Sequence, residues 1–140
     1  MDVGINYLAV LLAAASSMVV GSIWYAKPVM GKQWQKLARV TDKDMEQGVA
    51  YSLGITAVVS LITAYVLAHV IYLSNSYFHN SFLQDSLTTA FWLWLGFTAA
   101  RIITHDAFEH RRKKLTLITI SHELVTLLVM GLIIGLFGRP

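Results

Sequence analysis

The chain has 140 residues, of which 56% are hydrophobic and 14% charged, and its mean hydropathy is +0.57. A soluble domain has roughly 45–50% apolar and about 25% charged residues, so a chain this small could not bury its apolar surface in water. The absence of cysteine excludes disulfides, thiolate metal sites and cysteine nucleophiles. The formal net charge is +3, but the basic residues flank apolar runs, which indicates membrane topology signals rather than a nucleic-acid surface.

Four apolar stretches are each long enough to cross about 30 Å of hydrocarbon as a helix. None alternates polar and apolar residues as a barrel strand does, and in lipid a helix satisfies its own backbone hydrogen bonds. The predicted spans are residues 3–25, 49–73, 86–108 and 115–137. The sequence therefore predicts an all-α fold, with a single domain over residues 1–140 that forms an integral membrane four-helix bundle.

The connection after the first span is long and polar. Trp24 and Tyr25 end that span as an aromatic pair of the kind found at the headgroup level. Residues 33–40 are basic, with Trp34 on the apolar side, and predict a short amphipathic segment on the membrane surface. The three aromatic residues are therefore predicted interfacial anchors. Thr41, followed by acidic residues, predicts the N-cap of the second helix.

Basic residues are distributed unevenly between the two sides of the membrane. The first and third connections share a side, and they carry nine of the eleven Lys and Arg residues: Lys27, Lys32, Lys36, Arg39, Lys43, Arg111, Arg112, Lys113 and Lys114. The positive-inside rule places these connections in the cytoplasm. Both termini are then predicted on the outer, periplasmic side.

Small residues recur every four positions on the first and fourth spans. They are Ala9, Ala13, Ser17, Gly21, Gly131 and Gly135. Lipid gives no hydrophobic drive for helices to associate, so such ridges favour close backbone approach. They predict either packing within one bundle or an interface between copies. Because one chain has too few helices to enclose a wide pore, a transport path is predicted to need a homo-oligomer.

Two charged residues lie deep inside the predicted spans, more than five residues from either end, and a charge at the helix centre costs about 2.5–3.5 kcal/mol. They are Arg101 in the third span and Glu123 in the fourth. In an antiparallel hairpin centred near Arg112 they would lie at one depth, which predicts an ion pair. His105 follows Arg101 by one helical turn, and His122 directly precedes Glu123. Together these groups predict a polar cleft between the third and fourth spans, open to the cytoplasm.

Three interpretations of this cleft remain open. The first is a site that binds a small anionic solute or relays protons, because histidine titrates near neutral pH. Its residues would be Arg101, Glu123, His105 and His122. In the second interpretation the ion pair and the histidines are purely structural. The third interpretation is a metal site.

The metal interpretation concerns a short segment at the end of the third span. Its candidate ligands are His105, Asp106, Glu109 and His110, at a spacing similar to a histidine box of membrane desaturases and hydroxylases. Those enzymes use histidines from several boxes, whereas this chain has five histidines in total. A di-iron site is therefore not predicted, no cofactor is expected, and no reaction is assigned.

Several short motifs near the N-terminus form a recognisable pattern. They are Asn6-Tyr7-Leu8-Ala9-Val10, Gly21-Ser22-Ile23-Trp24-Tyr25, Pro28, Gly31-Lys32, Trp34, and the segment from Thr41 to Asp44. This pattern resembles a family of small bacterial membrane proteins catalogued as domain of unknown function 1761. The resemblance is specific over residues 5–46 and looser, as a four-span pattern, beyond them. It implies a bacterial inner-membrane protein and implies no activity.

The leading functional hypothesis is a small oligomeric transport or channel-like protein with the polar cleft as its site. The alternative is a structural or accessory membrane protein that packs against partner helices, with the buried charges purely structural. A membrane enzyme is the third hypothesis. The lipid bilayer is the expected environment, and no nucleic-acid partner is expected.

Overall fold

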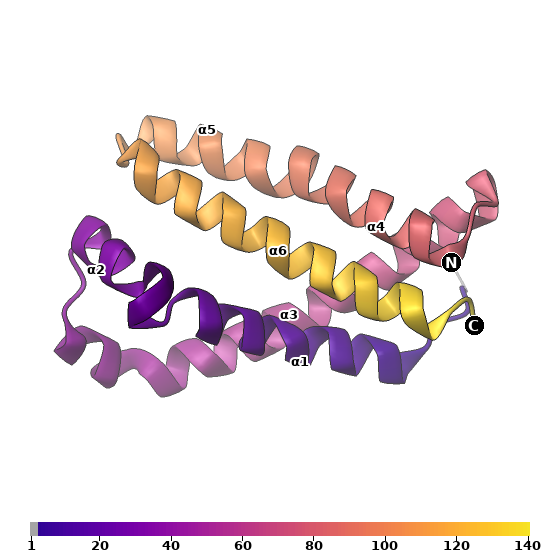
Figure 1. Ribbon diagram of the computed structural model, residues 1–140, viewed down its shortest axis with the longest axis horizontal. Helices are drawn as coiled ribbons and strands as arrows, with labels where there is room; N and C mark the ends of the chain where they lie inside the picture. Colours follow the sequence, from indigo (N-terminus) through magenta and orange to yellow (C-terminus); the bar gives the residue numbers. More distant parts are fainter. Residues whose placement is uncertain (1–2) are drawn as a thin grey trace.

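The computed structural model describes residues 3–140, and all regular structure in that range is helical (Figure 1). Four rods form the bundle. They are α1 (Tyr7–Trp24), α3 (Asp42–Phe78), a third rod built end to end from α4 (Phe82–Leu93), η2 (Trp94–Ala99) and α5 (Ala100–Phe108), and α6 (Lys113–Phe137). Between α1 and α3, the π-helical η1 (Lys27–Gly31) leads into the short helix α2 (Lys32–Ala38).

Within residues 3–140, four helices are long and apolar enough to cross a membrane, so the predicted all-α four-span fold is confirmed. These candidate spans are Tyr7–Trp24, Asp42–Phe78, Phe82–Phe108 and Lys113–Phe137. The second is longer than predicted at both ends. Its 37 residues extend about 55 Å, well beyond the ~30 Å of the hydrocarbon core. Either its polar first turns therefore extend outside the apolar layer, or the helix is tilted in the membrane.

Side-chain caps set where the helices begin. The side-chain oxygen of Asn6 accepts a hydrogen bond from the Ala9 backbone N–H at 3.1 Å, which starts α1. The predicted cap at Thr41 is confirmed, because its hydroxyl accepts from the Asp44 N–H at 3.2 Å. The Asp44 carboxylate accepts in return from the Thr41 N–H at 2.8 Å. Such caps satisfy N–H groups that have no partner inside the helix.

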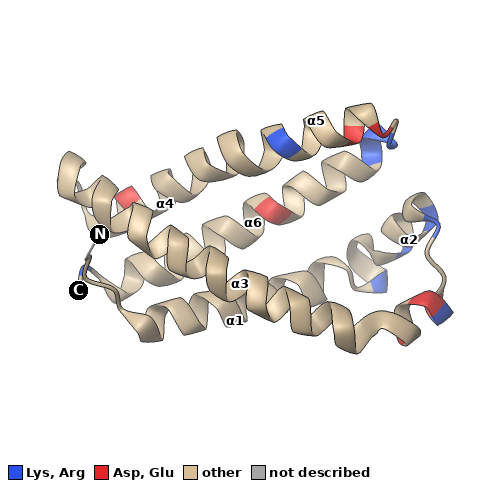
Figure 2. Ribbon diagram, turned by 180° about the vertical axis from the view of Figure 1, so that it is seen from behind, with Lys and Arg blue, Asp and Glu red and all other residues tan. Residues whose placement is uncertain are grey.

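The bundle has two chemically different ends (Figure 2). Lys and Arg gather at one end, called here the basic end, which consists of η1, α2, the start of α3 and the α5–α6 turn. The termini lie at the opposite, terminal end. There, the Asp85 carboxylate accepts hydrogen bonds from the amides of Asn75 at 2.8 Å and Asn80 at 2.9 Å. Arg139 donates to the Ser76 hydroxyl at 3.0 Å, which ties the C-terminus to α3.

The small-residue ridge on α1 is buried along most of its length. Ala9, Ala13 and Ser17 are all less than 10% exposed. Ser17 Oγ lies 2.7 Å from Ser60 Oγ, which joins α1 to α3. Gly21, at the end of the ridge, faces α6, where a Cβ in its place would lie 3.6 Å from His122 Nε2.

The two glycines of α6 lie against α4 of the same chain. A Cβ on Gly131 would approach Ala90 Cβ to 2.9 Å, and one on Gly135 would approach Leu83 Cδ1 to 2.8 Å. Both distances are shorter than ordinary van der Waals contact, so the backbones of α4 and α6 come as close as glycine allows. Both glycines thus pack within one bundle, and an interface between copies stays a prediction.

The bundle is tightly packed toward the terminal end and open toward the basic end. The core cluster consists of Val10, Ala13, Ala14, Ala64, Leu67, Ala68, Ile71, Ala90, Leu127, Met130 and Ile134. By contrast, residues 49–59 of α3 are all exposed, and most of α5 is exposed as well. Figure 1 shows α3 and α5 diverging as they approach the basic end. The candidate site lies in this diverging half.

Candidate functional site

A cavity of about 1050 Å³ lies between the diverging spans. All four rods contribute to its wall. Much of the lining is apolar, including Leu67 on α3, Leu93 and Phe97 on the third rod, and Leu127 and Met130 on α6. The volume is that of a site for a drug-sized molecule, since ligand cavities commonly measure about 300–1,000 Å³.

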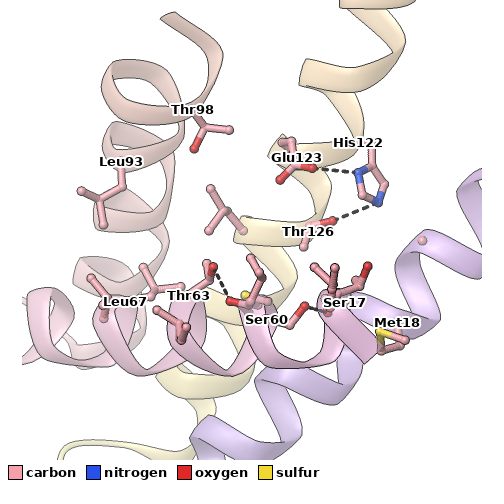
Figure 3. Close-up of a pocket in the computed structure, with 18 of the residues that line it drawn as sticks. Ser17, Met18, Ser60, Thr63, Leu67, Leu93, Thr98, His122, Glu123 and Thr126 are labelled. Atoms are coloured by element: carbon pink, nitrogen blue, oxygen red, sulfur yellow. Dashed lines mark hydrogen bonds and ion pairs between the residues drawn. The ribbon is translucent and has the colours of Figure 1, made fainter. Parts of the chain in front are cut away.

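The polar part of the wall comes from α6. His122 Nδ1 lies 3.2 Å from Glu123 Oε1, and Thr126 Oγ1 lies 3.4 Å from His122 Nε2 (Figure 3). A neutral imidazole protonated at Nδ1 satisfies both contacts, because Nδ1–H then donates to the carboxylate and Nε2 accepts from the hydroxyl. The three side chains thus form one hydrogen-bonded chain that ends on Glu123.

Glu123 is the member of this chain that faces open space. Its side chain is 35% exposed, whereas that of His122 is 14% exposed. Figure 3 shows Glu123 directed from α6 toward the third rod and Thr98, while His122 points to the other side, toward α1. Among the cavity-lining residues in the described range 3–140, Glu123 is the single Asp, Glu, Lys or Arg. The cavity is therefore an apolar space with one carboxylate in its wall.

Aromatic rings from the end of α1 surround His122. The ring centroid of Tyr25 lies 5.0 Å from that of His122, and the centroid of Trp24 lies 6.1 Å away. Tyr25 also contacts Trp34 of α2 edge-to-face at 5.3 Å. The three aromatic residues expected at the membrane interface thus cluster beside the cavity. Within the described chain, Trp24 Nε1 is buried and without a hydrogen-bond acceptor, a cost of about 1–3 kcal/mol.

Hydroxyl groups on the other rods line the cavity opposite α6. Ser60 of α3 bonds Ser17 of α1, and Thr63 Oγ1 donates to the Val59 carbonyl at 2.9 Å. Thr98 of η2 lines the cavity from the third rod. These groups are dipoles that can share a hydrogen bond with an occupant but carry no charge to neutralise Glu123.

Arg101 and His105 lie outside the cavity wall and are exposed on α5. Over residues 3–140, the side-chain partner of the Glu123 carboxylate is His122, and the predicted ion pair with Arg101 is not formed. The depth argument placed the two charges by their distance from the turn and did not fix the direction of either side chain about its helix axis, which in the third rod depends on the π-helical η2. A π turn takes in one extra residue, which rotates the following residues by roughly 100° about the helix axis. The structure thus brings together two of the four expected site residues.

The candidate metal ligands lie at the basic end, away from the cavity wall. His105, Asp106 and Glu109 can each place a ligand atom within 4.8 Å of the others, and His110 is not part of this group. Asp106 is buried and accepts a hydrogen bond from the Thr116 hydroxyl at 2.6 Å. That bond closes the turn between α5 and α6, which gives the carboxylate a structural role.

The part that α3 plays in the site was not predicted. Thr56, Ser60 and Thr63 of α3 all line the cavity, together with apolar residues of the same helix. The available signal was their spacing, because residues three and four apart share a helix face. Without the packing of the helices, that face could not be assigned to a cavity rather than to another helix.

Four apolar spans packed into one bundle, with many large apolar side chains exposed, define a multi-pass membrane protein that contacts the lipid bilayer. Residues 8–135 match the model of a family described as "Protein of unknown function (DUF1761)", and the chain belongs to that family. The resemblance seen in the N-terminal motifs is thereby confirmed, and it extends through the fourth span. Neither the curated proteins nor the solved structures contain a match to this chain.

Proposed function

We propose that this protein is a small membrane transporter whose site is the cavity, with Glu123 and His122 as the groups that hold a solute or exchange a proton. The observation that carries the proposal is a carboxylate in the wall of a large cavity between four apolar spans. Ionisable groups inside a membrane are costly, and they are typical of substrate pathways and proton relays. Arg101 and His105 are outside the proposed site.

Orientation and assembly belong to the same proposal. We place the protein in a bacterial inner membrane, as the family resemblance implies, and the positive-inside rule supports an orientation with the basic end in the cytoplasm and the termini outside. The cavity would then lie in the cytoplasmic half. Because the core cluster fills the terminal half, a path to the other side requires repacking or a second copy, and we include a homo-oligomer in the proposal.

Flux measurements in proteoliposomes test the proposal. Glu123→Gln removes the charge and keeps the side-chain shape, and it is expected to lower proton flux at least about tenfold, given the usual strength of charge-assisted contacts. The flux is followed with an internal pH-sensitive dye under an imposed membrane potential. Arg101→Gln is the matched control, since it neutralises an intramembrane charge outside the cavity, and it is expected to keep wild-type flux. Equal flux in wild type and Glu123→Gln would contradict the proposal.

A structural or accessory role is the second candidate, and the hydrogen-bonded chain formed by Glu123, His122 and Thr126 favours it. In that case the wild type would show no flux above protein-free liposomes. Glu123→Gln would then lower the unfolding temperature instead. A stoichiometric complex with one larger membrane protein would support the accessory form of this role.

A further inference from the structure

We infer that the cavity binds a lipophilic organic cation, meaning an apolar molecule of drug size with one delocalised or alkylated positive charge, which enters sideways from the lipid. This inference rests on the proposed site and names its substrate class. Three features of the cavity carry it: the sign of its charge, its apolar lining and its lateral opening.

The charge of the cavity favours a cation. Glu123 faces the open space, and the lining in residues 3–140 includes neither Lys nor Arg to balance it. With His122 neutral, its Nδ1–H donates to the carboxylate but leaves the net charge at one negative unit. A bound cation would neutralise the site at close range in a medium of low dielectric constant, where the interaction is strong. The other titratable groups in the cavity lining are His122 on α6 and Tyr25, the C-cap of α1, whereas α3 and the third rod present hydroxyls and apolar groups.

The lining of the cavity favours an apolar body around that charge. Aliphatic and aromatic side chains from α3 and the third rod form most of the wall that faces Glu123. A small inorganic cation would find one carboxylate and scattered hydroxyls, too few oxygen ligands to replace its water shell. A molecule that fills much of 1050 Å³ would instead bury apolar surface against the wall.

The opening of the cavity favours entry from the bilayer. Several residues both line the cavity and are exposed, and they lie on α3 and on the third rod, on either side of the opening: Ile55, Val59 and Ile62 on α3, and Phe97 on η2. Phe97 is 76% exposed, so the edge of the mouth is apolar on both sides. In a membrane such a mouth faces acyl chains, and a molecule dissolved in the hydrocarbon reaches it without crossing water.

Anionic solutes and phospholipid headgroups fit this cavity poorly. The expectation of an anionic solute depended on Arg101, which is exposed outside the wall. The ammonium group of a zwitterionic phospholipid is linked to a phosphate, which would bring a second negative charge close to Glu123. A cation without an attached anion is therefore the better occupant.

Two ions of nearly the same shape and opposite charge test the inference. Tetraphenylphosphonium is the cation and tetraphenylborate the anion. Binding of each is measured by equilibrium dialysis against the full-length protein in phosphatidylcholine nanodiscs, with empty nanodiscs as the baseline. The wild type is expected to bind tetraphenylphosphonium saturably, and tetraphenylborate, measured in separate samples because the two ions form a sparingly soluble salt, is expected not to bind above the baseline. Glu123→Gln is expected to weaken cation binding at least about tenfold, while Arg101→Gln leaves it unchanged.

Further variants and controls distinguish a failure of this inference from a failure of the proposed function. Glu123→Asp keeps the charge and is expected to retain most of the binding, and size-exclusion elution checks that each variant is folded. Cation binding that is equal in wild type and Glu123→Gln, or saturable binding of tetraphenylborate as strong as that of the cation, would overturn the inference. So would loss of binding in phosphatidylethanolamine nanodiscs, because an aminolipid would then be the occupant. Saturable Glu123-dependent binding without flux would refute transport alone, and Glu123-dependent proton flux without cation binding would refute the substrate class alone.

Discussion

At the scale of single residues, one buried carboxylate joins two spans at the terminal end. Asp85 is 3% exposed and accepts hydrogen bonds from the side-chain amides of Asn75 and Asn80. Asn75 lies in the last turn of α3 and Asp85 in the first turn of α4, so these bonds fix the turn between the two helices. Asn75 also donates to the Asn80 carbonyl at 3.0 Å.

Replacing this carboxylate should destabilise the bundle. Asp85→Ala leaves one N–H of the buried Asn75 amide without its acceptor, which costs about 1–3 kcal/mol, whereas the exposed Asn80 amide can bond water instead. We expect the free energy of unfolding in detergent to fall by at least that amount, as measured by denaturant titration followed by circular dichroism. Gln84→Ala, at the exposed neighbouring position, is the control and should change stability by less than about 0.5 kcal/mol. Equal losses in the two variants would show that the hydrogen bonds contribute little.

Arg101 and Glu123 mark how far the site could be predicted from the sequence. Glu123 stands out because a carboxylate inside an apolar span is costly, and the structure places it in the cavity wall. The depth of each charge follows from its distance along the chain. The direction in which a side chain points about the helix axis changes by about 100° per residue. The one extra residue taken in by η2 therefore rotates Arg101 relative to α4, which packs on α6. The sequence carries no comparable signal for a π turn.

At the scale of helices, α4 and α6 approach each other closely at the two glycines of α6. A Cβ on Gly131 would come within 2.9 Å of Ala90 Cβ and 3.1 Å of the Ser86 carbonyl oxygen. The second of these is a backbone atom, so relief requires that α4 itself move. In lipid, where helices gain no hydrophobic energy by associating, this close contact supplies much of the attraction between the two helices.

Adding one methyl group should therefore loosen the pair. We expect Gly131→Ala to lower the free energy of unfolding by about 1–3 kcal/mol, as overpacking does in tight interiors. Gly54→Ala is the matched control, because its Cβ would meet nothing within 4 Å and alanine favours the helix. Thermal unfolding of both variants in one detergent gives the comparison. If Gly131→Ala changed the number of subunits in the assembly and left stability unchanged, this face would instead be assigned to an interface between copies.

The lengths of the helices were harder to predict than their number. Hydropathy locates only the part of a helix that crosses hydrocarbon, so the second span was predicted as residues 49–73, whereas α3 runs from Asp42 to Phe78. Its real ends depend on local chemistry. The capping box of Thr41 and Asp44 starts it, and His79 ends it with a left-handed backbone conformation at φ 57°. The Thr41 cap could be predicted from residue types, whereas nothing in the sequence marked His79 as the end.

At the scale of the whole molecule, the uneven packing of the bundle creates the site. The terminal half is filled by the core cluster, and the half near the basic end opens into the cavity. The four spans could be predicted from hydropathy because the lipid and the interior of the bundle are equally apolar, so all faces of a span carry apolar residues. For the same reason hydropathy could not distinguish a side chain that faces another helix from one that faces lipid. The lateral opening between α3 and η2 therefore had no counterpart in the sequence.

The orientation of the molecule can be tested directly because the chain has no cysteine. Lys43 and Tyr77 are both exposed and lie near opposite ends of α3, about 50 Å apart at 1.5 Å per residue, farther than the hydrocarbon core is thick. In Lys43→Cys and Tyr77→Cys variants, the new thiols should thus be on opposite sides of the membrane.

The excess of Lys and Arg at the basic end predicts which side each thiol occupies. A membrane-impermeant maleimide added to intact bacterial cells is expected to label Tyr77→Cys and to leave Lys43→Cys unlabelled until the cells are permeabilised. The reverse pattern would place the basic end, and with it the open half of the cavity, on the outer side. A cation drawn from the membrane would then be bound on the outer side, so the direction of the proposed transport depends on this labelling result.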